Sequence, residues 1–164
     1  MKIIVTRGPK SESAEPEPIV DRQEGNTVKR LAVIITRGAY NNLLQACELA
    51  RIASQAGTQV SILFRDEAAA RMTKDKIHKL ALSPAYKGRE NVVTEMLEEK
   101  KLHDLPAILR GIKDTCDAKF SVCRSSIELF DVKVEELIPE LDEVQTAEAF
   151  WMEEVVPADQ IVTF

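Results

Sequence analysis

Apolar and polar positions alternate along the chain in blocks that predict strands and helices in turn. Residues 31–36 form a continuous run rich in Val and Ile, which is typical of a parallel strand buried on both faces. Residues 40–56 carry apolar side chains at helical spacing and end before Gly57, a common residue at helix C-termini. A second β-branched run follows at 58–64. A helix between two such strands predicts a right-handed crossover and a sheet that is parallel at its centre.

The rest of the chain continues this alternation less regularly. The pattern is mostly helical over 66–82, and a loop follows at 83–90. The later predicted elements are an amphipathic helix at 91–101, a helix from about Leu105 to Cys116, a strand at 119–122, short helices around 125–130 and 134–141, a helix near 146–155 and a last strand at 160–164. Together these elements predict an α/β fold, a three-layer α/β/α domain with a mostly parallel central sheet.

The N-terminal part has a different composition. Residues 9–30 hold three of the seven prolines and few apolar side chains, which predicts a linker or a tail. Before it, IIVTRG at 3–8 is similar to VIITRG at 33–38. Either the similarity is chance, or residues 2–7 add a strand to a sheet edge. We therefore expect an N-terminal extension over 1–30 and one α/β domain over 31–164.

Composition and charge exclude several classes of protein. The 164 residues are 45% hydrophobic and 30% charged, which is typical of a globular domain with a hydrophobic core. The net charge of -5 argues against nucleic acid or a membrane surface as a partner. The longest apolar runs fall far below the ~20 residues of a membrane span, and MKIIVTRGPK does not resemble a signal peptide. We therefore expect a cytoplasmic protein.

Three cysteines, Cys47, Cys116 and Cys123, form no CxxC pair, which argues against a secreted disulfide scaffold or a thioredoxin-like couple. Cys47 lies on the apolar stripe of a predicted helix and is expected in the core. A strand of about four residues, ~13 Å long, separates the other two, which argues against a disulfide between them unless the turn geometry brings them closer. Cys123 precedes a helix and an arginine, an environment that favours a thiolate, although an inert buried cysteine is the alternative.

Polar residues also follow the carboxyl ends of the three predicted strands, where ligands bind in open α/β sheets. Each of these ends carries an arginine, and guanidinium groups bind small oxyanions. The residues expected to bind an anion beside Cys123 are Arg37, Gly38, Arg65, Arg124, Ser125 and Ser126. The alternative is that each arginine pairs with a surface carboxylate.

Motifs for other kinds of site are absent from the sequence. His78 and His103 are far apart with no ligand motif around them, so we expect both to face solvent and expect no metal site. The chain has no GxGxxG, GxxxxGK[ST] or GxSxG motif. We therefore expect no cofactor.

Two long segments carry a resemblance to a known family. They are AVIITRGAYNNLLQACELARIASQAGTQVSILF at 32–64 and FSVCRSSIELFDVKVEELIPELDEVQTAEAFWMEEVVPADQIVTF at 120–164. In the second, a strand leads to Cys123, further helices follow, and Asp159 precedes the last strand. In this order of elements the chain resembles the DsrE/DsrF-like sulfur-relay family over residues 31–164. It departs from the family pattern at Phe130-Asp131, where many relatives have a glycine.

The resemblance implies a sulfur carrier or sulfurtransferase whose Cys123 accepts sulfur as a persulfide or a thiosulfonate. The implied partners are a small sulfur-containing anion such as thiosulfate, sulfur donor or acceptor proteins, and copies of the same chain in a trimer or hexamer. Two other functions stay open. A thiol peroxidase would use the same thiolate, although the expected Thr-x-x-Cys arrangement is missing. A non-catalytic oligomeric module would bind a small anion or nucleotide at the strand ends.

Overall fold

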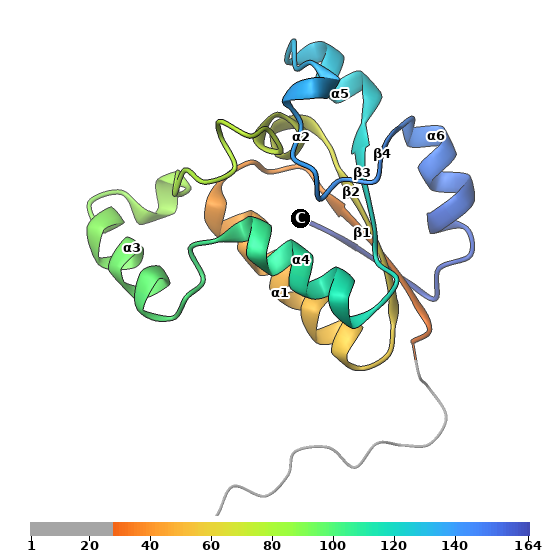
Figure 1. The fold of residues 1–164 in the computed structure, drawn as a ribbon, viewed down its shortest axis with the longest axis horizontal. Helices are drawn as coiled ribbons and strands as arrows, with labels where there is room; N and C mark the ends of the chain where they lie inside the picture. Colours follow the sequence, from red (N-terminus) through yellow and green to blue (C-terminus); the bar gives the residue numbers. More distant parts are fainter. Residues whose placement is uncertain (1–27) are drawn as a thin grey trace, which may run out of the picture.

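Five parallel strands form the centre of the structure, a computed structural model that describes residues 28–164. The strands are β1 (Arg30–Ile35), β2 (Gln59–Phe64), β3 (Lys119–Cys123), β4 (Glu143–Gln145) and β5 (Gln160–Thr163). Their spatial order is β4-β3-β2-β1-β5, and all neighbours are parallel. The predicted parallel sheet is therefore confirmed, and the carboxyl ends of its strands share one edge (Figure 1).

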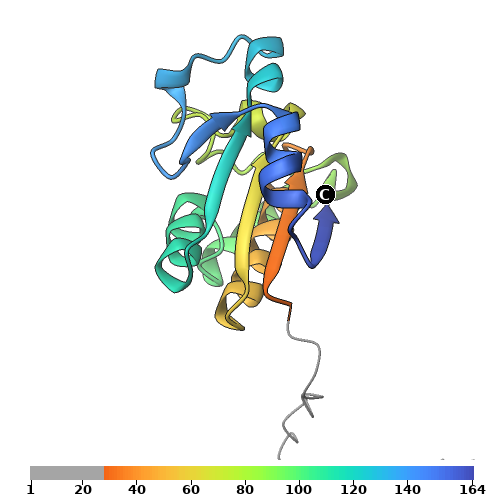
Figure 2. The same cartoon turned by 90° about the vertical axis from the view of Figure 1, so that its right-hand side faces the viewer.

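Helices lie on both faces of this sheet and confirm the three-layer α/β/α fold. One face is covered by α1 (Tyr40–Gln55) and α4 (Leu105–Thr115). The other is covered by α6 (Ala147–Phe150) and its π-helical continuation η3 (Trp151–Val155), as Figure 2 shows. The remaining helical elements are α2 (Asp66–Arg71), η1 (Pro84–Tyr86), α3 (Glu90–Glu99), α5 (Arg124–Leu129) and η2 (Val134–Glu136).

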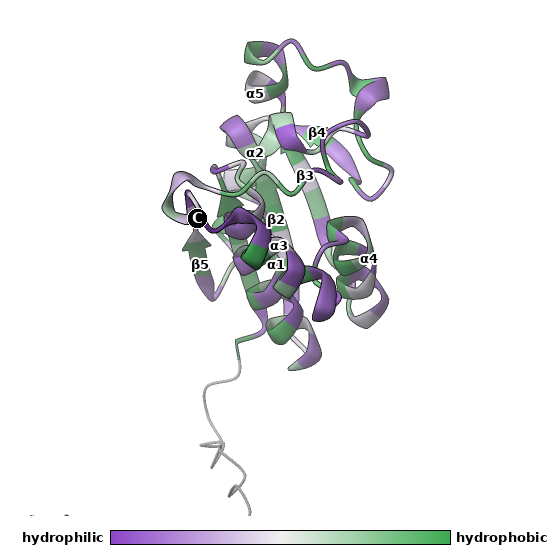
Figure 3. Ribbon diagram, turned by 90° about the vertical axis from the view of Figure 1, so that its left-hand side faces the viewer, coloured by the Kyte–Doolittle hydropathy of each residue, from purple (hydrophilic) through white to green (hydrophobic). Residues whose placement is uncertain are grey.

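Successive side chains of a strand point to opposite faces of the sheet, so the two faces bury different residues. Phe120 and Val122 of β3 pack in a large apolar core with α1 and α4. Cys123, on the opposite face, belongs to a small apolar group below α6 and η3. The other buried members of this small group are Ala32, Leu63, Phe150 and Val155. Figure 3 shows apolar residues along the central strands and polar residues along α3.

The helix predicted over 66–82 is wrong beyond Arg71. The residues after α2 form turns, because their backbone pairs with a distant segment instead of continuing the helix. Thr73 makes an isolated antiparallel bridge with Leu137, and the Ile138 amide donates to the Met72 carbonyl at 3.1 Å. The tertiary pairing therefore overrides the local helical pattern.

The helix predicted over 134–141 is also wrong, because only η2 (Val134–Glu136) is helical there. The bridge of Leu137 to Thr73 ends the helical path, and a turn at 139–140 then leads to β4. β4 was not predicted from the sequence, because this three-residue edge strand is too short for a periodic pattern.

The departure from the family pattern at Phe130-Asp131 has a backbone explanation, since Asp131 has a φ of 51° just after α5. Aspartate tolerates this glycine-like conformation better than most residues.

The two ends of the chain meet at β1. This strand begins at Arg30, one residue before the predicted range, and the Asp159 carboxylate accepts hydrogen bonds from the Lys29 and Arg30 amides at 2.8 and 2.9 Å. The possible strand at 2–7 and most of the predicted extension lie outside the described residues. Between residues 28 and 164, no helix has the length and apolar character to cross a membrane.

Candidate functional site

Cys123 occupies the junction between β3 and α5, as the sequence predicted. It is the last residue of the strand and the N-cap of the helix. Its side chain lies on the face below α6 and is fully buried, with an exposed fraction of 0%. The Sγ atom lies 3.2 Å from the Ser125 hydroxyl oxygen. The thiol is thus enclosed on one side by apolar groups and contacted on the other by hydrogen-bond donors.

Those donors decide the ionisation of Cys123. Burial acts to raise the pKa of its thiol, because the charged form loses hydration. Hydrogen bonds from the Ser125 hydroxyl and from the amide and hydroxyl of Ser126, together with the positive charge of Arg65, outweigh burial and leave the pKa below its usual value. The geometry therefore favours the thiolate, which is the nucleophilic form of cysteine.

Ser126 is held in place by the neighbouring helix α2. Its hydroxyl oxygen accepts a hydrogen bond from the Asp66 amide at 2.9 Å, so the hydroxyl hydrogen stays available for Cys123. Asp66 has a φ of 47°, an unfavourable conformation for a residue with a side chain. Local strain of this kind is common where the surrounding structure fixes a functional group. Asp66 was not recognised from the sequence, because a positive φ leaves no pattern there.

The other two cysteines have the opposite electrostatic character. All three are free thiols, as the spacing predicted. Burial, followed by the charge of Glu48, raises the pKa of Cys47 to about 12. Burial is also the main cause that raises the pKa of Cys116. Cys123 is therefore the one cysteine of this chain whose surroundings favour a thiolate.

Of the three arginines predicted at one anion site, Arg65 is the one whose charge reaches Cys123. Its Nε atom is buried and has no hydrogen-bond partner in the described structure. Arg124 begins α5 with an exposed side chain. The structure thus brings Arg65, Ser125 and Ser126 together around Cys123.

The remaining predicted residues follow β1, which β2 separates from β3. Arg37 is exposed and lines a different hollow of about 550 Å³ beside Asn42 and Thr163. The Gly38 amide donates to the Glu67 carboxylate at 3.3 Å. The sequence showed that these residues follow a strand, but it could not show the distance that the strand order imposes.

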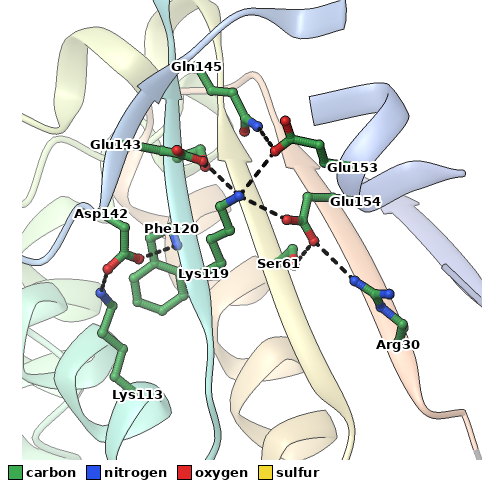
Figure 4. A network of polar contacts seen from close by, with 11 residues as sticks. Arg30, Ser61, Lys113, Lys119, Phe120, Asp142, Glu143, Gln145, Glu153 and Glu154 are labelled. Atoms are coloured by element: carbon green, nitrogen blue, oxygen red, sulfur yellow. Dashed lines mark hydrogen bonds and ion pairs between the residues drawn. The ribbon is translucent and has the colours of Figure 1, made fainter. Parts of the chain in front are cut away.

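The cover over Cys123 is formed by α6 and η3, and a polar network that was not recognised from the sequence holds it against the sheet (Figure 4). Lys119 Nζ lies 3.0 Å from an oxygen of Glu154, a residue of η3 that is only 8% exposed. The other Glu154 oxygen accepts a hydrogen bond from the Ser61 hydroxyl at 2.6 Å and lies 3.7 Å from Arg30. The remaining carboxylates on Lys119 are Glu143 at 2.9 Å and Glu153 at 3.4 Å. Because strands and helix contribute opposite charges, the network fixes η3 to the sheet.

The residues described here contain no cluster with the composition of a metal site. Among positions 28–164, no group of three or more His, Cys, Asp or Glu side chains is arranged to hold a metal ion. His78 and His103 are both exposed, as predicted from their surroundings.

Comparisons with known proteins relate the chain to one family. The model of the DsrE/DsrF/DrsH-like family matches residues 63–160, a range that includes Cys123, Arg65 and the whole cover. A solved structure, protein of unknown function MTH1491 from Methanobacterium thermoautotrophicum, superposes with a TM-score of 0.51 at 12% identity. The match covers 82% of this chain and 98% of that one, and shows that the fold is shared. No curated protein matches significantly.

Proposed function

Because the chain belongs to the DsrE/DsrF/DrsH-like family, we propose that it is a cytoplasmic sulfur carrier or sulfurtransferase of a sulfur relay or of sulfur oxidation, with Cys123 as the sulfur-accepting residue. Membership of this family supports a role related to sulfur relay. The observation that carries the assignment is the contrast among the thiols, since the pKa is lowered at Cys123 and raised at Cys47 and Cys116.

The proposed reaction starts with the Cys123 thiolate. The thiolate attacks the sulfane sulfur of a donor such as thiosulfate, a bond forms between Sγ and that sulfur, and the donor S–S bond breaks. Sulfite leaves with the electron pair of the broken bond, and Cys123 carries a persulfide. The thiolate of an acceptor protein then attacks the outer sulfur and releases the Cys123 thiolate. No net oxidation is required, because sulfane sulfur is passed between thiols.

Arg65 is suited to bind the donor. Its guanidinium group can pair with the sulfonate of the donor, while its charge also stabilises the thiolate. The hydroxyls of Ser125 and Ser126 supply further donors on the same side of Cys123. Arg37 lies at the end of β1, so we assign it no part in this step.

Access to Cys123 requires movement of the cover, because the side chain is fully buried. Phe150 and Val155 pack in the same small apolar group as the thiol. We infer that a donor or partner protein reaches Sγ when the segment Ala147–Val155 shifts away from the sheet. A short helical segment can move in this way while the other face of the sheet stays folded.

We further propose that the chain forms a homo-oligomer, a trimer or hexamer as in the family it resembles. The outer side of η3 supports self-association, because Trp151 and Met152 are 55% and 62% exposed and Val156 is 60% exposed. Ile161 of the neighbouring edge strand β5 adds a further exposed apolar side chain. Exposed apolar groups of this size often mark a protein contact.

Intact-mass spectrometry tests the sulfur-accepting role. The full chain is incubated with thiosulfate or polysulfide, and its mass is compared with those of Cys123→Ser, Cys47→Ser and Cys116→Ser. We expect wild type and the last two variants to gain the mass of one sulfur atom and Cys123→Ser to gain none. An unmodified wild type with either donor, or an equal gain in Cys123→Ser, would contradict the proposal.

A further inference from the structure

A second hollow opens beside α2, on the side of the molecule where the turns after that helix pass. It measures about 330 Å³ and lies between the start of α1, the turns over 76–84 and the end of α5. The residues of the anion site at Cys123, namely Arg65, Ser125 and Ser126, are absent from its lining. A ligand bound in this hollow would therefore be independent of the proposed sulfur chemistry at Cys123.

Arg71, the last residue of α2, lines this hollow with an unusual guanidinium group. The residue is only 8% exposed, and its Nε and Nη2 atoms are enclosed without any hydrogen-bond partner in the described structure. Burial lowers the pKa of Arg71, because the charged group has lost hydration, and the neighbouring Tyr40 offsets this only in part. Buried guanidinium groups are normally paired with carboxylates, since an unpaired buried charge is strongly unfavourable. The missing partner is thus an anion.

The nearest carboxylate in the hollow does not fill that role. Glu67 precedes Arg71 by four residues on the same helix, a spacing at which ion pairs commonly form. Its carboxylate instead accepts the hydrogen bond of the Gly38 amide at 3.3 Å, and no ion pair joins it to Arg71 between residues 28 and 164. Lys76 adds a second positive charge to the lining. Two cations and one occupied carboxylate leave the hollow with an excess of positive charge.

The rest of the lining is largely apolar. Its walls include Ala39, Ala70, Leu82, Pro84 and Phe130. A fully hydrated inorganic anion gains little from such walls, whereas a molecule with an apolar body buries surface against them. The volume falls at the lower end of the range of about 300 to 1,000 Å³ that is typical of small-molecule sites.

We propose that this hollow binds a small organic carboxylate, whose carboxylate group pairs with Arg71 and whose apolar body packs against Leu82 and Phe130. Nε and Nη2 are enclosed, so the carboxylate pairs with the guanidinium group through Nη1, where a charge-assisted hydrogen bond forms. Lys76 stabilises the same charge from the rim. Glu67 opposes it, so the site discriminates against dianions of high charge density.

Titration calorimetry with the full chain tests this site, with benzoate as the probe. Benzyl alcohol has the same ring without the charge, and inorganic phosphate has charge without the ring. We expect benzoate to bind at least about tenfold more tightly than either, because a charged hydrogen-bonded pair and an apolar contact act together. Equal binding of phosphate, equal binding of benzyl alcohol, or no binding of benzoate would each overturn the proposal.

Variants of the residues that line the hollow should change the affinity for benzoate in opposite directions. Arg71→Met should abolish benzoate binding, and Lys76→Gln, which leaves the buried groups intact, should weaken it several-fold. Glu67→Gln should strengthen it, because an opposing charge is removed. Lys79→Gln changes an exposed lysine outside the hollow and is the matched control, expected to bind like wild type. Unchanged affinity in both Lys76→Gln and Glu67→Gln would contradict the proposal, even if Arg71→Met fails to fold.

Discussion

The two faces of the sheet are covered in different ways. On one face, α1 and α4 pack against a large apolar core that includes Phe64 and Phe120, each with no exposed surface. On the other, nine residues of α6 and η3 cover the small apolar group around Cys123 and are fixed by the charged network at Lys119. Apolar burial dominates stability, whereas partly exposed ion pairs contribute less.

This difference indicates where we expect the molecule to open. We expect the face with α1 and α4 to open only by unfolding, and the cover over Cys123 to separate when the Lys119 network and the contacts of Phe150 and Val155 break. Part of that cover is a π-helix, a form that occurs mostly as short insertions and often at functional sites. Cys123, the proposed sulfur acceptor, thus lies on the side of the sheet that we expect to need less free energy to open.

The largest change expected is on the apolar face. Phe64→Ala removes a fully buried ring from the central strand β2, so we expect the free energy of unfolding to fall by about 3 to 5 kcal/mol. Urea denaturation followed by circular dichroism measures this. A loss below 1 kcal/mol, roughly that of an ordinary surface change, would show that this face does not dominate stability.

A smaller change is expected at the charged network. Lys119→Met removes the cation shared by three carboxylates and should lower the free energy of unfolding by about 2 kcal/mol, since Lys119 is itself partly exposed. The rate of alkylation of Cys123 should rise by more than the fall in the free energy of unfolding accounts for, because the cover opens before the rest of the protein unfolds. Lys113→Met is the matched control, since it breaks a Lys–Asp pair without contacting η3. Equal acceleration in both variants would contradict local opening.

At Cys123 itself, the expected change concerns ionisation. Ser126→Ala removes a hydroxyl that donates to the thiolate, so the neutral thiol gains relative to the charged form and the pKa of Cys123 rises. The thiolate absorbance, titrated against pH with Cys123→Ser as the baseline, should therefore appear at higher pH than in wild type. Ser83→Ala, which changes a serine that precedes η1 and makes no side-chain cap hydrogen bond, should leave the titration in place. A shift to lower pH in Ser126→Ala would refute the hydrogen-bond assignment.

The smallest change in stability is expected on the outer side of the cover. Trp151 is 55% exposed, so Trp151→Ser should alter the free energy of unfolding of dilute protein by no more than about 0.5 kcal/mol. The same variant should form smaller assemblies in light scattering, because it removes the largest exposed apolar side chain of η3. An unchanged assembly size would argue against this surface as the contact between copies.

The sequence predicted the elements whose pattern is local. The strands at 31–36 and 58–64, the helix between them and the position of Cys123 all follow from periodicity and were confirmed within a residue or two. β4 and the turns after α2 were missed, because their form depends on pairing between distant segments. Sequence patterns carry no direct record of such pairing.

In the candidate site, too, residues close in the chain were predicted and contacts between distant segments were not. Cys123, Ser125 and Ser126 are neighbours in the chain, so their proximity was predictable, and Arg65 was expected because it follows a strand. Arg37 was placed with them by the same rule, but the strand order puts β2 between β1 and β3. The network around Lys119 joins residues that are far apart in the chain, such as Ser61 and Glu154, which are 93 positions apart, and no local motif indicates it.

Peptide mapping of the three cysteines tests the central claim most directly. Wild type is treated with polysulfide under native conditions, alkylated, digested and analysed by mass spectrometry, so that each cysteine serves as a control for the other two. We expect added sulfur on the peptide with Cys123 and none on the peptides with Cys47 or Cys116. Sulfur on either of those peptides in preference to Cys123 would contradict it.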